Sequence, residues 1–188
     1  GERGALVRSL TSTNMIDRLG ERYGVPVFET AVGFKYICPI MLREDALMGG
    51  EESGGYGFRG HIPERDGILS GLMMLEYMVK TGRRPSELMD DLFQAVGPHY
   101  YNRRDVSFDA EDRPTLVGKL ESAELGEVAG LRVAGGDSVD GRRFLFESKA
   151  WLLARFSGTE PLLRIYAEAD SPQVVEKLLD GAQAFLGV

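Results

Sequence analysis

Short apolar runs alternate with segments of helical periodicity through the first half of the chain. The runs are rich in residues that favour strands, and the segments between them repeat apolar residues every three or four positions. This pattern predicts strands at residues 5–10, 25–29 and 46–48, and helices at residues 15–23, within 34–44 and at 67–81. Repeated strand–helix units of this kind indicate a layered α/β sheet.

The residues that start and stop helices support these bounds. Asn14 can cap the first helix, Gly24 is a natural stop for it, and Pro39 should bend or shorten the second. Asp66 can cap the long third helix. We expect one stripe of that helix to be buried, which comprises Ile68, Leu69, Leu72, Leu75, Met78 and Val79.

The pattern changes after Gly97-Pro98. A helix that starts at Pro85 ends there, because neither glycine nor proline continues a helix well. Beyond this break, strand runs are predicted at residues 101–108, 131–134, 143–147, 151–156 and 162–167, with Asp140-Gly141 as a hairpin signal. Ser171-Pro172 starts a C-terminal helix, whose apolar face comprises Val175, Leu178, Leu179, Ala182 and Leu186. We therefore place a domain boundary near residue 98.

The bulk composition narrows the class of protein. Hydrophobic residues make up 43% of the 188 residues and charged residues 27%, with a formal net charge of −7, which is typical of a globular protein. The charge is spread over both halves and leaves no basic stripe, so we expect no nucleic-acid partner. The apolar runs are far shorter than a bilayer requires, so we expect no membrane partner. Cys38 is the single cysteine, which excludes an internal disulfide and fits a cytoplasmic protein.

A glycine-rich polar loop at Gly49–Gly55 follows the predicted strand at 46–48, where open α/β sheets place their ligands. If this segment is extended, the side chains of Glu51 and Ser53 project to one side and Glu52 points away. A carboxylate beside a hydroxyl can accept and donate hydrogen bonds to adjacent hydroxyls of a sugar. A solvated glycine-rich turn explains the composition equally well.

A second polar loop, between the last two predicted strands, has the composition of a phosphate cradle. Arg155 offers a planar fork of donors that matches phosphate oxygens, and Gly158 lets backbone N–H groups converge on an anion. The hydroxyls of Ser157 and Thr159 add two further donors. An ordinary β-turn explains the loop equally well. Arg164, in the strand that follows, either supports such a site or forms a structural ion pair.

Four segments resemble, in order, motifs of the α-D-phosphohexomutases, the family of phosphoglucomutase and phosphomannomutase. Gly50–Gly54 is similar to the family's G-E-x-S-G sugar-recognition loop, and Arg155–Pro161 to its R-x-S-G/N-T phosphate loop. Thr30–Lys35 resembles its T-x-x-G-x-K stretch, and His61–Gly67 its H-I-x-x-K/R-D-G segment. The resemblance covers essentially the whole chain, and the ordered set is specific although each motif alone would be weak.

The resemblance implies an incomplete α/β/α mixed-sheet domain followed by a small α+β domain. Residues 1–97 would be the C-terminal part of the family's third domain, which carries the sugar-binding loop. Residues 98–188 would be its fourth domain, which carries the phosphate-binding loop on an antiparallel sheet with packed helices, like that of the TATA-binding protein. The hinge between the two would lie near Gly97-Pro98.

The resemblance also implies roles for the polar residues. Glu51 and Ser53 would hold the hydroxyls at sugar carbons 3 and 4, and Arg65 would reach phosphate or sugar. The phosphate that does not react would be bound by Arg155, Ser157, Gly158 and Thr159, with Arg164 in support. Weaker candidates for substrate contacts are His61, Thr30, Gly33 and Lys35.

Family members interconvert hexose 1-phosphate and hexose 6-phosphate. The phosphoryl group is carried by a serine, the intermediate is a hexose 1,6-bisphosphate, and Mg²⁺ is held by an aspartate-rich loop. This chain contains neither the nucleophile segment nor the metal loop, so we expect no catalytic residue, no metal ligand and no mutase activity in it alone. It would bind a phosphorylated hexose together with the missing N-terminal domains of the same protein.

Alternatives stay open at this point. The chain would instead be a stand-alone phosphosugar-binding module, or a purely structural assembly surface, if no catalytic domains accompany it. Within the family, Glu52 in the variable position of the sugar loop favours phosphoglucomutase and disfavours glucosamine phosphate as substrate. Phosphomannomutase stays an alternative, because glucose and mannose share the hydroxyl configuration at carbons 3 and 4.

Overall fold

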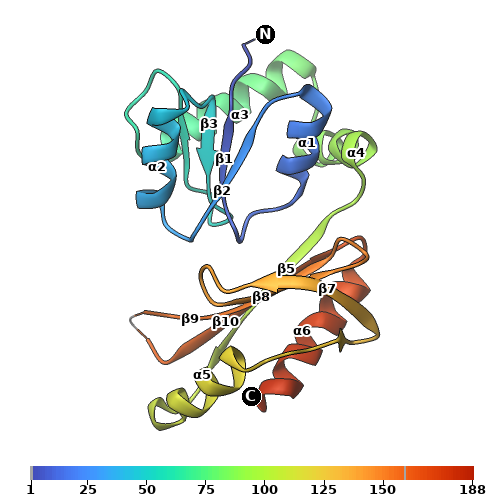
Figure 1. Ribbon diagram of the computed structural model, residues 1–188. Helices are drawn as coiled ribbons and strands as arrows, with labels where there is room; N and C mark the ends of the chain where they lie inside the picture. The colour runs from blue at the N-terminus through green and yellow to red at the C-terminus, as the bar shows by residue number, and fades with distance from the viewer. Residues whose placement is uncertain (1, 159) are drawn as a thin grey trace. The chain divides into compact units, whose positions relative to one another are not determined.

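The described chain, residues 2–158 and 160–188 of the computed structural model, divides at Gly97/Pro98 into two units that each contain a sheet (Figure 1). The first unit is mixed α/β and the second is built on an antiparallel sheet. The predicted fold class, a mixed-sheet α/β domain followed by a small α+β domain, is confirmed.

The sheet of the first unit has the strand order β2-β1-β3-β4. Strand β1 pairs in parallel with both β2 and β3, and β3 pairs antiparallel with β4. The elements are β1 (Leu6–Ser9), α1 (Met15–Tyr23), β2 (Val27–Thr30), α2 (Phe34–Arg43), β3 (Met48–Gly50), β4 (Tyr56–Phe58), α3 (Gly67–Thr81) and α4 (Pro85–Val96).

The core of the first unit lies between the sheet and α2. Val7 of β1 is buried among Phe34, Ile37 and Met41, three residues on one face of α2. Figure 1 shows α1 on the opposite side of the sheet from α2. This arrangement follows from right-handed crossovers, because the chain leaves β1 in one direction to form β2 and returns past β1 to form β3.

The predicted strand at 46–48 was misplaced. Strand β3 starts at Met48 and includes Gly49 and Gly50, and the short β4 that pairs with it was not predicted. Glycine has a low intrinsic preference for strands, so the pattern placed the strand on the apolar residues before it. The actual register is set by pairing, because Val7 of β1 lies opposite Gly49.

The bounds and cap of α3 were predicted correctly, but its buried stripe was not. Asp66 accepts a hydrogen bond from the N–H of Leu69 at 2.9 Å, as a helix cap does. Ile68 and Val79 are nevertheless 81% and 74% exposed, and Leu72 and Leu75 are exposed as well. In the described part of the chain α3 packs against β4, one of the two edge strands of its sheet, and most of its apolar side chains are not covered by another layer.

The second unit has the strand order β5-β10-β9-β8-β7-β6, with every neighbouring pair antiparallel. Helices α5 and α6 pack on it, and the predicted face of α6 is buried as expected. Helix α5 and strand β6 were not predicted. The elements are β5 (Tyr100–Ser107), the 3₁₀ turn η1 (Ala110–Asp112), α5 (Arg113–Glu121), β6 (Glu127–Val128), β7 (Leu131–Asp137), β8 (Arg142–Phe146), β9 (Trp151–Phe156), β10 (Leu162–Ala169) and α6 (Pro172–Leu186).

None of the helices in the described residues combines the length and the apolar character needed to cross a lipid bilayer.

The difference between α2 and α3 can be measured. Ile37→Ala should lower the free energy of unfolding of the first unit by about 2–5 kcal/mol, because Ile37 is fully buried and its truncation leaves a cavity. Leu72→Ala should change it by about 0.5 kcal/mol or less, because Leu72 is exposed on α3. Native-state hydrogen exchange of the β1 amides reports both values. Equal losses from the two variants would show that α3 is packed as tightly as α2.

Candidate functional site

Three loops of the first unit meet at the edge of its sheet that is formed by the carboxyl ends of the parallel strands. Strands β1, β2 and β3 are parallel, so their carboxyl ends lie together, and β1 lies between the other two where the chain crosses in opposite directions. This is the position at which open α/β sheets bind ligands. The loops at this edge are residues 10–14 after β1, 31–33 after β2 and 51–55 after β3.

Glu51 is the first residue of the third loop and is buried, with 5% of its surface exposed. Its Oε1 accepts a hydrogen bond from the backbone N–H of Gly33 at 2.9 Å. Gly33 precedes the first turn of α2, and the positive end of the helix dipole favours a carboxylate there. The backbone of Glu51 bonds to Gly55 and Gly54 at 3.0 and 3.1 Å, which closes the turn between β3 and β4.

This turn differs from the extended segment expected from the sequence. Gly54 has a φ of 90°, a value that glycine adopts readily, and the chain folds back to pair β4 with β3. As a result Glu51 is buried and Ser53 is exposed. Glu52 does not simply point away, because its Oε2 accepts a hydrogen bond from the Thr11 hydroxyl at 2.7 Å.

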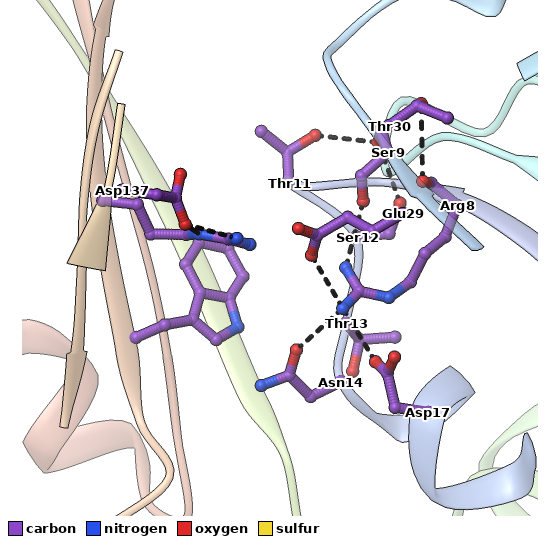
Figure 2. Close-up of polar contacts among 12 residues, drawn as sticks. Arg8, Ser9, Thr11, Ser12, Thr13, Asn14, Asp17, Glu29, Thr30 and Asp137 are labelled. Carbon is purple, nitrogen blue, oxygen red and sulfur yellow. Dashed lines mark hydrogen bonds and ion pairs between the residues drawn. The ribbon is translucent and has the colours of Figure 1, made fainter. Parts of the chain in front are cut away.

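Hydroxyl groups crowd the loop after β1, and this feature was missed in the sequence. The side chains of Ser9, Thr11 and Ser12 are buried, and the Ser9 Oγ lies 3.0 Å from the hydroxyl oxygens of the other two (Figure 2). The signal was available, because Thr11 begins a run of four hydroxyl or amide residues directly after a predicted strand. It occupies the same place relative to its strand as the glycine-rich loop does.

Arg8 ties this edge of the sheet to α1. Its Nη2 lies 2.8 Å from Oδ2 of Asp17 and 2.9 Å from Oε2 of Glu29, and it also bonds to the Asn14 side chain (Figure 2). Arg8 is 5% exposed, and a buried cation requires such partners. No sequence motif identified Arg8, because its partners come from two different elements.

Arg65 and His61 lie beside the glycine-rich loop. Arg65 is half exposed, with its Nη1 3.6 Å from Oε2 of Glu51 and its guanidinium 5.7 Å from the ring centre of Phe34. The Nε2 of His61 lies 2.8 Å from Oδ2 of Asp66, the residue that caps α3. The N–H of Leu69 and the imidazole of His61 both hydrogen bond the Asp66 carboxylate and hold its pKa below the ordinary value.

The three remaining weaker candidates, Thr30, Gly33 and Lys35, lie at the end of β2 and the start of α2. Thr30 ends β2 and is buried, with its hydroxyl donating to the carbonyl of Ala31 at 2.9 Å. Gly33 contributes the N–H that holds Glu51. Lys35 lies one residue into α2, and its ammonium lies 4.9 Å from the ring centre of Tyr36.

The second polar loop joins β9 to β10 in the second unit. The N–H of Ser157 donates to the carbonyl of Leu162 at 2.8 Å, and Ser157 is buried. Gly158 is exposed at the tip of the turn. Thr159, the remaining predicted ligand, lies outside the described residues.

Arg155 is the last residue but one of β9, directly before the loop. Its Nε lies 3.2 Å from Oδ1 of Asp140, and its side chain is 15% exposed. Burial opposes the charge, but the Asp140 carboxylate and a hydrogen bond with Tyr166 outweigh it, so the pKa of Arg155 is raised above its ordinary value. Arg155 is therefore a permanent, oriented cation next to Ser157.

Two further arginines frame this loop. Arg164 lies directly opposite Arg155 in the β9–β10 register, so the two share one face of the sheet. Its Nε is 3.9 Å from Oδ2 of Asp105, the limit of an ion pair. Arg113, which was missed because α5 was not predicted, donates from Nη2 to the carbonyl of Ser157 at 3.1 Å and stacks on Phe156 at 5.3 Å.

Within the residues that the structure describes, no group of three or more His, Cys, Asp or Glu side chains could hold a metal ion. The polar groups described above are carboxylates and hydroxyls in the first unit, and arginines with backbone groups in the second. These groups suit a polyhydroxyl ligand and an anion respectively.

Comparisons with known proteins return one family over most of the chain. A family model described as phosphoglucomutase/phosphomannomutase, alpha/beta/alpha domain III, matches residues 1–96, and the model of the C-terminal domain of the same family matches residues 118–182. A curated phosphoglucomutase/phosphomannomutase of Thermococcus kodakarensis is 34% identical over 177 residues, which are 94% of this chain and 36% of the relative. A phosphoglucosamine mutase of Methanococcus maripaludis is 31% identical over 93% of this chain and 37% of its own length.

Solved structures agree. A Thermus thermophilus structure, assigned provisionally as a phosphomannomutase, matches with a TM-score of 0.81 and 39% identity over 100% of this chain and 37% of its own. Aspergillus fumigatus N-acetylphosphoglucosamine mutase, solved with GlcNAc-6P and magnesium, shares the fold at a TM-score of 0.56 and 19% identity, over 97% of this chain and 40% of its own. The chain thus spans little more than a third of the length of the curated relatives named above.

The Asp66 contacts predict a pH dependence. A carboxylate whose pKa is lowered by folding stabilises the folded state above its unfolded pKa, and this contribution is lost as the pH falls through the lowered value. The first turn of α3 should therefore fray in acid, and a ¹³C titration of the Asp66 carboxyl should have its midpoint below that of an ordinary aspartate. His61→Ala should raise this midpoint part of the way, and Asp66→Asn should remove the pH dependence of the Leu69 amide. A midpoint at or above the ordinary value would refute the assignment.

Proposed function

This chain belongs to the phosphoglucomutase/phosphomannomutase family, and from this we propose that it is the sugar- and phosphate-recognition half of a phosphohexomutase. The complete protein would interconvert hexose 1-phosphate and hexose 6-phosphate. The first unit would correspond to the later part of the family's third domain and the second unit to its fourth domain.

The buried carboxylate of Glu51 is the observation that carries this proposal. It lies at the carboxyl ends of the parallel strands, where open α/β sheets generally bind ligands, and it is held in place by the Gly33 N–H at 2.9 Å. A fixed acceptor in a glycine-rich turn suits the hydroxyl groups of a sugar, which donate hydrogen bonds from a rigid ring. The exposed hydroxyl of Ser53 and the half-exposed cation of Arg65 would complete the contacts with the sugar.

The second unit would bind the phosphate that does not react. Arg155 carries a permanent charge, and its planar fork matches two phosphate oxygens. Ser157, Gly158 and Thr159 would add hydroxyl and backbone donors, with Arg164 as a second cation on the same face. Binding energy from this remote phosphate would orient the reacting end of the substrate, which is a large part of what phosphoryl transfer requires.

The chemical step would be performed outside this chain. We propose that a phosphoserine and a hexose 1,6-bisphosphate intermediate belong to the complete protein, as the motif resemblance implies. Magnesium is present in the Aspergillus fumigatus structure, but the described residues hold no cluster of side chains that fits it. No step of the proposal therefore passes through a metal on this chain.

Among hexoses, we propose glucose phosphate as the preferred substrate, with mannose phosphate as the alternative. The curated relatives include phosphoglucosamine mutases as well as phosphoglucomutases, so the comparisons do not separate these substrates. Glu52 takes the variable position of the sugar loop, and its contact with Thr11 joins that loop to the loop after β1. A stand-alone phosphosugar-binding module is the competing function.

Titration of the chain with glucose 1-phosphate, followed by amide NMR, tests the proposal. Resonances of residues 49–55 and 155–158 should shift together. Arg155→Ala should weaken the affinity about tenfold or more, because hydrogen bonds to charged groups contribute about 1.5–3 kcal/mol. Glu51→Ala should also weaken it, whereas Arg132→Ala, which removes an exposed arginine of β7, should leave it unchanged. Shifts in neither loop would refute the assignment.

Both candidate functions, the recognition half of a mutase and the stand-alone binding module, predict that this chain alone has no mutase activity. A turnover assay tests this. With glucose 1-phosphate, glucose 1,6-bisphosphate and Mg²⁺ supplied, this chain alone should form no glucose 6-phosphate, because the phosphoryl carrier lies elsewhere. The full reading frame should carry a serine nucleophile segment upstream if the chain is half of a mutase. An upstream frame without one would favour the binding module, and turnover by this chain would contradict both.

A further inference from the structure

The β7–β8 hairpin turn lies against the end of β9, next to the loop that starts at Ser157. Its Asp140-Gly141 pair was recognised in the sequence as a turn signal and has no role in the function proposed above. In the structure Oδ1 of Asp140 lies 3.2 Å from Nε of Arg155, and the two side chains are 24% and 15% exposed. The turn therefore places a carboxylate next to Arg155, the residue proposed to bind the phosphate.

Gly141 fixes how closely this turn approaches β9. Its φ is 94°, and a Cβ at this position would collide with the carbonyl oxygen of Ala154 and lie 2.6 Å from Cβ of Arg155. Only glycine provides both the conformation and the space. The contact between Asp140 and Arg155 is thus imposed by the backbone of the hairpin and is not a chance meeting of two long surface side chains.

The chemistry of the pair is specific. An arginine has five N–H donors in one plane, and a carboxylate that binds Nε fixes the rotation of that plane about the side chain. A free arginine side chain samples many rotamers and loses this freedom when it binds a ligand. If Asp140 has already restricted Arg155, less freedom is lost when an anion binds.

We propose that Asp140 is a positioning residue of the phosphate site, which acts by holding the Arg155 guanidinium in the orientation that receives the phosphate. The inference rests on the proposed function, because it assigns Arg155 its ligand. It also predicts the direction in which phosphate affinity changes when Asp140 is removed, and this direction distinguishes positioning from simple electrostatics. Asp140 is an anion close to an anion site, so electrostatics alone would have its removal tighten phosphate binding.

The test is the affinity of the chain for glucose 1-phosphate and for inorganic phosphate, measured by NMR titration. Asp140→Ala should weaken both about tenfold, the scale of coupled neighbouring residues, although it removes a negative charge. Asp140→Asn keeps an acceptor for Nε and should stay within about threefold of the wild type. In an Arg155→Ala background, Asp140→Ala should cause no further loss, since it acts through Arg155.

Asp137 provides the matched control. It belongs to the same hairpin and forms an aspartate–arginine pair, with Oδ2 2.6 Å from Nη2 of Arg143, and this pair does not include Arg155. Asp137→Ala should leave phosphate affinity unchanged or slightly tighter. Should Asp140→Ala lose the dispersed amide spectrum of a folded chain, Asp140→Ser, which is also too short to reach Nε, replaces it.

The outcomes separate this inference from the proposed function. Wild-type chain that binds neither probe would refute both. Binding that depends on Arg155 but is unchanged or tighter in Asp140→Ala would overturn the positioning role and leave the proposed function intact. An equal loss from Asp140→Ala in the presence and absence of Arg155 would also overturn it, because the residue would then act on the fold of the hairpin.

Discussion

The hydrogen bond between the Glu51 carboxylate and the Gly33 N–H joins the loops after β3 and β2, and the arrangement at the carboxyl ends of the first unit's parallel strands depends on it. A buried carboxylate is costly unless its oxygens are satisfied, and the start of α2 supplies a donor and a favourable dipole together. Because Glu52, the residue after Glu51, accepts a hydrogen bond from Thr11 in the loop after β1, the connections after β1, β2 and β3 are joined to one another. These contacts within the protein hold the three loops together.

The second unit uses the same principle with the opposite charge. Arg155 is largely buried at the end of a strand, and Asp140 holds its side chain from an adjacent hairpin. Arg113 holds the carbonyl of Ser157 from the start of α5. In both units, a rigid strand end carries the charged residue and a neighbouring element fixes its orientation, which is the arrangement that precise recognition requires.

Sequence patterns predicted those features whose causes are local. The bounds of α3 and the buried face of α6 follow from caps and helical spacing, and both polar loops were found from their composition. The exposure of Leu72 could not be predicted, because periodicity shows that a face is apolar and not that a layer covers it. Strand β3 was misplaced because pairing with β1 outweighs the low strand preference of Gly49. The Arg8 and Arg113 contacts join residues of different elements, and no local signal marks such pairs.

The bond between Thr11 and Glu52 has a consequence for how this edge can evolve. Glu52 lies in the turn between β3 and β4, and its side chain is an acceptor for the buried Thr11 hydroxyl, which also contacts Ser9. A change of residue 52 alone leaves the Thr11 hydroxyl without this acceptor in a site that water does not readily reach. Substitutions at positions 11 and 52 should therefore be correlated, and a substitution at either position affects two loops at once.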